Sequence, residues 1–286
     1  MNILGLFVVV PVLMILFLFL CKDIKSIRAV MVTGATALLA LTAVLIVTFL
    51  RERAANPDAE MLLVQSWTWY APLNITMTLG VDGISVMMIA LSSIIVFTGV
   101  FSSWNMDMAK EFFLWYCLLT IGVFGFFITI DLFSMFMFYE VALIPMYLLI
   151  GLWGTGKKEY SAMKLTLMLM GGSAFLMIGI IGIFFTSGAT TFNIVDIANS
   201  VRIPIEHQRW IFPVTFLGFG VLGALFPFHT WSPDGHASAP TSVSMLHAGV
   251  LMKLGGYGCL SYARSCSRAG LDIPHTYGYI GGVRSI

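Results

Sequence analysis

Apolar segments about 20 residues long, separated by shorter polar stretches, follow one another along most of the chain. A helix of about 20 apolar residues, rising about 1.5 Å per residue, crosses the roughly 30 Å hydrocarbon core of a bilayer. The pattern predicts about eight such helices, over residues 1–21, 28–50, 82–103, 112–130, 132–153, 162–186, 210–228 and 243–263. The predicted fold class is therefore an all-α, polytopic membrane protein.

The segments between these helices refine the prediction. The fourth and fifth helices are joined by little more than Asp131, which predicts a tight antiparallel pair. Residues 51–80 are expected to form a long polar loop, with Trp67 and Trp69 at the membrane–water interface. The first apolar segment lacks a basic start and a small-residue cleavage site, so we interpret it as a retained helix and not as a signal peptide.

Composition supports a membrane protein and excludes other classes. Of the 286 residues, 59% are hydrophobic and 10% are charged, whereas soluble domains carry roughly 25% charged residues. This composition makes the lipid bilayer an expected partner. The net charge of +1 leaves no large basic face, so nucleic acid is not an expected partner. The four cysteines are scattered without metal-ligand spacing, so we predict no metal, haem or iron–sulfur site in this chain.

Lysine and arginine residues predict the orientation, because cytoplasmic loops carry an excess of them. The short loops of one side contain Lys22, Lys25, Arg28, Lys110, Lys157 and Lys158. The longer loops of the other side, where the rule is weaker, contain Arg51, Arg53, Arg202 and Arg209. The first side is therefore predicted to be cytoplasmic. The chain then crosses the cell inner (plasma) membrane several times, with its N-terminus outside.

One carboxylate lies near the middle of a predicted span, Glu140 in LFSMFMFYEVALIPMYLLIGLW (132–153). A charged group at the bilayer centre costs about 3 kcal/mol on insertion scales and marks a functional site by default. The alternative is a protonated glutamic acid that only forms a hydrogen bond with a neighbouring helix.

The eighth predicted span contains Lys253, about ten residues into the helix and too deep to reach either surface easily. Gly249 and Gly256 share its helical face, which predicts either close helix contact or room for water. A lysine in such a place can release and recapture a proton. His247 lies on another face and is either a proton relay or a packing residue. Lys164, near the start of the sixth span, either snorkels to the surface or takes part in the same function.

The stretch LFPFHTWSPDGHASAPTS (225–242) cannot continue one regular helix, because it contains Pro233, Pro240 and Gly235. Backbone that is not helical at membrane depth lines a water-filled cavity or is buried in protein. His229 and His236 bracket this break, but too few ligands accompany them for a metal site. A broken helix beside buried charges is typical of ion transporters.

Three segments resemble subunit M of NADH–quinone oxidoreductase, the respiratory complex I. They are VDGISVMMIALSSIIVFTGVFSSW (81–104), DLFSMFMFYEVALIPMYLLIGLWG (131–154) and FPFHTWSPDGHASAPTSVSMLHAGVLMKLGGYG (226–258). The resemblance covers residues 1–264 and is specific, because the three motifs occur in the expected order. The wider family includes Mrp-type cation/proton antiporter subunits, and VDGIS favours subunit M over them.

The resemblance implies a proton-translocating, antiporter-like subunit that holds no cofactor itself. NADH, FMN, iron–sulfur clusters and quinone would then belong to partner subunits, and the partners would include other membrane-arm subunits with antiporter-like folds. The family's glutamate in the fifth helix corresponds to Glu140, and its lysine in the eighth corresponds to Lys253. The family also breaks its seventh helix where Pro227 to Pro240 falls here.

The chain departs from the family's pattern in two ways. The family places a lysine seven residues before the HxW motif, here His229 to Trp231, and Leu222 occupies that position. His229, His247 or Lys164 would have to supply the missing partner of Glu140. The family also continues with a second five-helix repeat, whereas the tail from Cys266 resembles no ninth helix, as expected of a truncated chain.

We therefore predict a three-helix region over residues 1–103, a first five-helix antiporter-like repeat over 104–264, with a broken seventh helix, and a non-membrane tail over 265–286. The predicted function is proton translocation coupled to electron transfer from NADH to quinone in respiration. One alternative is a subunit of an Mrp-type cation/proton antiporter. The other is a truncated piece of the membrane arm that assembles but does not pump.

Overall fold

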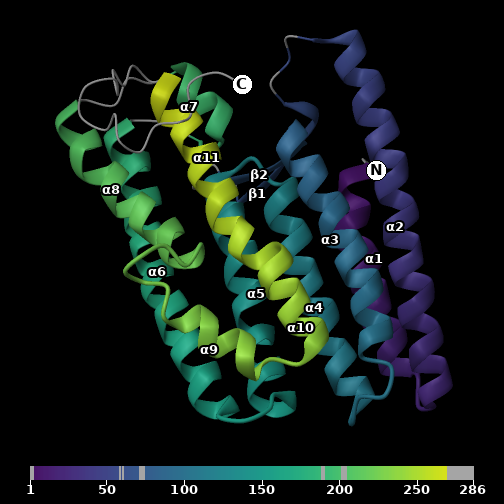
Figure 1. The fold of residues 1–286 in the computed structure, drawn as a ribbon. Helices are drawn as coiled ribbons and strands as arrows, with labels where there is room; N and C mark the ends of the chain where they lie inside the picture. The colour runs from purple at the N-terminus through teal and green to yellow at the C-terminus, as the bar shows by residue number, and fades with distance from the viewer. Residues whose placement is uncertain are drawn as a thin grey trace.

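Long helices running up and down beside one another form the body of the protein in the computed structural model (Figure 1). The structure describes residues 3–57, 59, 61–70, 75–187, 191–200 and 205–268. Six helices within these ranges are long and apolar enough to cross a membrane. They are α1 (Ile3–Leu20), α2 (Ile24–Ala55), α3 (Gly83–Ser102), α4 (Ala109–Ile128), α5 (Leu132–Trp153) and α6 (Lys158–Ser187). The predicted helical membrane fold and the first six spans are thus confirmed.

Helix α4 is the central helix of the bundle. In the most apolar 18-residue stretch of each helix, 78% of α4 is buried within the protein, against 28% of α1 and 39% of α6. Helix α4 can approach α5 closely because Gly122 and Gly125 lie at their interface, against Ala142 and Phe138. Small residues let transmembrane helices pack at short distance. The connection of only three residues, 129–131, is what the tight antiparallel pair requires.

Two of the helix starts have clear local causes. Asp82 caps α3 with a capping box, in which its side chain accepts from the Ser85 backbone and the Ser85 hydroxyl accepts from the Asp82 backbone. Asp131 caps α5 by accepting from the Phe133 backbone N–H and the Ser134 hydroxyl. Each cap satisfies backbone or hydroxyl donors that would otherwise have no partner at a helix start.

The structure corrects the prediction of a polar loop over residues 51–80. Helix α2 continues to Ala55, and two strands, β1 (Leu62–Tyr70) and β2 (Ile75–Val81), pair antiparallel. The run WTW (67–69) combines aromatic and β-branched residues, which favour strands. The Ile130 backbone N–H donates to the Thr78 carbonyl of β2, so the hairpin also holds the connection between α4 and α5.

Hydrogen bonds fix the opposite end of the bundle as well. Lys110 donates to the Phe19 and Cys21 carbonyls, and the indole of Trp153 donates to the Asp107 carbonyl. The loops at this end therefore lie together, and the lysines at positions 22, 25, 110, 157 and 158 lie in these loops or in the first turns of the helices that follow them. The lysines used to predict the orientation therefore lie at one end of the bundle.

The last two predicted spans are divided. In the expected helix over 210–228, α8 (Ile205–Leu222) ends at position 222 and an irregular stretch over 223–230 follows. The break therefore begins before Pro227, and part of the segment predicted as the break forms the short helix α9 (Trp231–Ser238). Ala224 has left-handed backbone, with φ 53°, which ends the helix before the two prolines that follow. The expected helix over 243–263 consists of α10 (Thr241–Leu246), a π-helix (His247–Leu251) and α11 (Met252–Arg268). A short helix, α7 (Ile194–Ser200), precedes α8.

The proposed division into residues 1–103, 104–264 and 265–286 stays a prediction. In the predicted tail, residues 265–268 belong to α11, and residues 269–286 lie outside the described part of the chain. Arg202, one of the charges used for orientation, also lies outside it.

Candidate functional site

Glu140 lies in the middle of α5, eight residues after the first residue of the helix. Its Oε1 is buried and has no hydrogen-bond partner among the described residues, while Ser173 of α6 interacts with the carboxyl. Pro145 follows in the same helix and has no N–H to donate to the Val141 carbonyl, one residue after Glu140. Glu140 therefore has a buried oxygen without a partner among the described residues, and the next residue in the helix has a carbonyl that lacks its usual donor.

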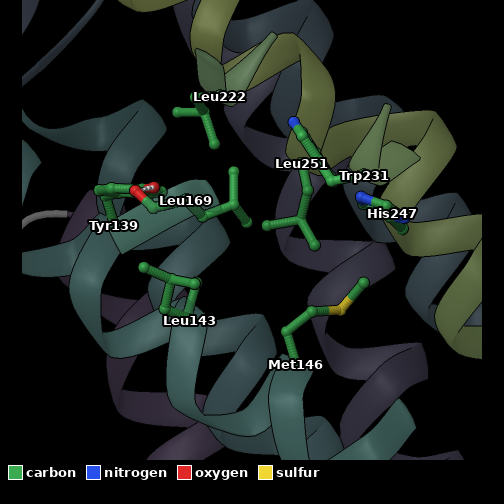
Figure 2. Close-up of a pocket in the computed structure, with 9 residues that line it drawn as sticks. Tyr139, Leu143, Met146, Leu169, Leu222, Trp231, His247 and Leu251 are labelled. Atoms are coloured by element: carbon green, nitrogen blue, oxygen red, sulfur yellow. Dashed lines mark hydrogen bonds between the residues drawn. The ribbon is translucent and has the colours of Figure 1, made fainter. Parts of the chain in front are cut away.

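A small cavity lies next to this point, between α5, α6, the break after α8, and the π-helix (Figure 2). Its volume is about 20 Å³, and its lining is almost wholly apolar. It is lined by Tyr139, Ala142, Leu143, Met146, Leu169, Leu222, Trp231, His247 and Leu251. Tyr139 donates its hydroxyl to the Leu169 carbonyl, 3.0 Å away, and so already has a partner. Leu222, the position of the expected lysine, and His247 thus line the same cavity.

His247 is the polar side chain of the cavity whose hydrogen bonding is unsatisfied. It is only 1% exposed, and neither ring nitrogen has a hydrogen-bond partner in the described part of the chain. Its ring stacks on His236 of α9, with centroids 4.2 Å apart, and contacts Trp231 at 5.3 Å. His236 in turn is bonded through Nδ1 to the Ser244 hydroxyl, at 3.2 Å. The π-helix that begins at His247 is a rare element that occurs often at functional sites.

Lys253 lies away from this cavity, in a groove between α3, α8 and α11. The groove has a volume of about 470 Å³ and is lined mainly by apolar residues. Lys253 is exposed there and donates to the Ala248 carbonyl. Gly249 lies against Ile95 of α3, which is a close helix contact, while Gly256 has nothing within 4 Å of where its Cβ would be.

The other two predicted site residues lie elsewhere. Lys164 forms an ion pair with Asp234 of α9, with Nζ and Oδ2 2.6 Å apart, and so joins α6 to α9. His229 is exposed in the irregular stretch and contacts the ring of Phe226 at 5.7 Å. The structure therefore places His247 at a cavity that residues of α5 on both sides of Glu140 also line, and places Lys253, Lys164 and His229 outside that lining.

Sequence reasoning missed Asp234 as the partner of Lys164, and Ser173 and His236 as neighbours of Glu140 and His247. Asp234 and His236 are both polar residues of the motif SPDGH, and that local signal could have singled them out. Ser173 offers no such signal, because its proximity depends on how α5 and α6 pack. Among the described residues, no group of three His, Cys, Asp or Glu side chains could hold a metal ion.

A protein-family comparison matches residues 129–280 to the family described as "NADH:quinone oxidoreductase/Mrp antiporter, TM". The match covers more than half of the chain, and the chain belongs to this family. The region matched contains the fifth helix, the broken helix and the π-helix described above.

Curated relatives give the same family. The chain is 34% identical over 199 residues to NAD(P)H-quinone oxidoreductase chain 4-2 of Synechocystis, covering 69% of this chain and 35% of the relative. It is 36% identical over 210 residues to NAD(P)H-quinone oxidoreductase chain 4 3 of Picosynechococcus, covering 72% of this chain and 38% of the relative. The chain thus matches little more than a third of the length of these relatives.

Solved structures share the fold. A chain of respiratory complex I from Thermus thermophilus matches with a TM-score of 0.80 and 23% identity, covering 95% of this chain and 55% of that one. A chain of the Mrp complex from Dietzia matches with a TM-score of 0.75 and 21% identity, covering 91% of this chain and 48% of that one. This chain, with its broken seventh helix, therefore shares its fold with a chain of each kind of complex.

Proposed function

We propose that this chain is a proton-translocating subunit of the membrane arm of an NADH–quinone oxidoreductase, of the subunit M type. The observation that carries the proposal is Glu140, an ionisable group in the middle of a bilayer-length helix, in a chain of this family. Ionisable residues at such depth are expensive and mark ion pathways. The names of the curated relatives, NAD(P)H-quinone oxidoreductase chain 4, favour this function over an antiporter.

In this proposal the chain moves protons and performs no redox chemistry. NADH, FMN, the iron–sulfur clusters and quinone are held by partner subunits, which include neighbouring antiporter-like subunits. The complex lies in the cell inner membrane, with the lysine-rich end of the bundle on the cytoplasmic side and the N-terminus outside.

Glu140 and Lys253 are proposed to exchange protons. Glu140 has a buried oxygen with no partner among the described residues, which suits an exchange with water. Lys253 donates to one carbonyl and lines a groove that is open at Gly256. An amine with room for water can lose its proton and regain it, which arginine does poorly at the same place.

The test is proton movement by the complex that contains this chain, reconstituted in liposomes. NADH with a quinone acceptor should acidify one side of the membrane, and a protonophore should abolish the gradient. A sodium gradient formed without NADH or quinone would instead favour the Mrp-type alternative. Assembly of the complex without any ion movement would favour the alternative of a piece that does not pump.

A further inference from the structure

We propose that the cavity between Tyr139, Leu222 and His247 binds a water molecule, and that His247 is the proton acceptor at this point of the pathway. The inference rests on the proposed function. It assigns to His247 the role that the family resemblance gives to a lysine at position 222, where this chain has leucine.

The first support is the geometry of the cavity. Leu222, at the last position of α8, and His247, at the first position of the π-helix, both line it (Figure 2). A longer side chain at position 222 that extended into the cavity would fill the space that the imidazole also lines. The cavity's volume is about 20 Å³, and a space of at least about 10–15 Å³ can hold one water.

The second support is hydrogen bonding. Both nitrogens of His247 are buried and have no partner in the described part of the chain. Buried polar atoms in proteins are nearly always bonded to protein or to an ordered water. Trp231 donates its indole N–H to the Val221 carbonyl and has no further donor, whereas the Tyr139 hydroxyl donates to the Leu169 carbonyl and its oxygen can still accept. A water in the cavity would therefore have two partners, the imidazole of His247 and the Tyr139 oxygen, which is the minimum that a buried water needs.

The proton balance is simple. A neutral imidazole accepts one proton at its unprotonated nitrogen and becomes an imidazolium with one positive charge, the charge that a lysine would carry. Release of one proton restores the neutral ring.

The other candidates for this role are placed differently. Lys164 is neutralised by Asp234, at 2.6 Å. His229 is exposed in the irregular stretch and does not line the cavity. Neither can take the place of a side chain at position 222 without a large movement.

Several titratable groups surround His247 and belong to the same network. His236 of α9 stacks on it and acts on its charge, and Lys253 of α11 acts on the charge of His236. Tyr139 of α5 lines the same cavity. His236 is half-buried and bonded to Ser244, so it is the next proton carrier from His247 in the direction of the α9–α10 connection.

The experiment compares variants of the complex in liposomes, with assembly checked by the amount of this chain in the purified complex. His247→Leu should lower proton translocation per NADH about tenfold or more, and adding Leu222→Lys to it should restore most of the loss. His207→Leu, the same change at an exposed histidine of α8, is the matched control and should have no effect. In the wild-type complex with ¹⁵N-labelled histidine, magnetic resonance should show a water cross-peak to one imidazole, which His247→Leu removes.

Two results would overturn the inference. One is wild-type translocation in assembled His247→Leu, and the other is the absence of a water cross-peak that depends on His247. Glu140→Gln and Lys253→Ala in the same preparations separate this inference from the proposed function. If Glu140→Gln and Lys253→Ala abolish translocation while His247→Leu does not, only the assignment of His247 is wrong and the proposed function stands. If none of the three has any effect, the proposed function itself is wrong.

Discussion

Gly172 of α6 lies directly against Val221 of α8, so that a Cβ at position 172 would come within 2.8 Å of the Val221 Cβ. The neighbouring glycine of the same helix, Gly171, has nothing within 4 Å of where its Cβ would be. The contact at Gly172 holds the end of α8, and with it Leu222, against α6.

Gly172→Ala should therefore destabilise the protein, by about 1–3 kcal/mol for a forced contact in a packed interior. Gly171→Ala is the matched control, because both changes gain up to about 1 kcal/mol of helix propensity. Thermal unfolding in detergent should show a lower midpoint for Gly172→Ala and an equal or higher one for Gly171→Ala. Equal midpoints for the two variants would mean that α6 and α8 are not this close.

Asp131 gives a prediction about pH. It lies between the spans, is fully buried, and burial raises its pKa from 3.8 to about 6. In the range between about pH 4 and pH 6 the folded protein therefore binds more protons than the unfolded chain. The stability contributed by this group falls as pH rises through that range, by about 3 kcal/mol in total.

Asp131→Asn should remove this loss, since an amide can still accept from the Phe133 N–H and contact the Ser134 hydroxyl. We expect the unfolding midpoint of the variant in detergent to exceed that of wild type above pH 6 and to approach it near pH 4. A variant that is less stable than wild type at pH 7.5 would show that Asp131 is stabilised as the anion.

Lys253 should matter through its exchangeable proton. Lys253→Ala in the assembled complex should lower proton translocation about tenfold or more. Lys253→Arg should give little recovery, because arginine keeps the charge but does not deprotonate. Lys25→Ala, at an exposed lysine of the loop end, should leave translocation unchanged. Full activity in Lys253→Arg would mean that the charge alone is needed.

The proposed orientation is tested by labelling single cysteines in intact cells. A cysteine at Lys157, in the connection between α5 and α6, should be protected from a reagent that cannot cross the membrane. A cysteine at Asn56, just after α2, should react. The positions lie at opposite ends of the bundle, so reversed accessibility would place the N-terminus in the cytoplasm.

The sequence was sufficient to predict the long helices, because about 20 apolar residues in succession leave few alternatives. It did not predict the hairpin, since β1 alternates polar and apolar residues only in part and its pairing with β2 depends on the turn between them. Glu140 and Lys253 could be found because charges are rare within apolar segments. The sequence could not choose among His229, His247 and Lys164 for the place of the missing lysine. His247 is 25 positions from Leu222, and the two residues line one cavity only because of how the broken helix packs against the π-helix.

If Glu140 belongs to a proton pathway, its replacement should change the number of protons translocated per NADH by the complex in liposomes. Glu140→Gln keeps the size and polarity of the side chain but cannot exchange a proton, so the account predicts a ratio clearly below that of wild type. Glu111→Gln, at an exposed carboxylate in the first turn of α4, is the matched control and should keep the wild-type ratio. An unchanged ratio in assembled Glu140→Gln would contradict the account.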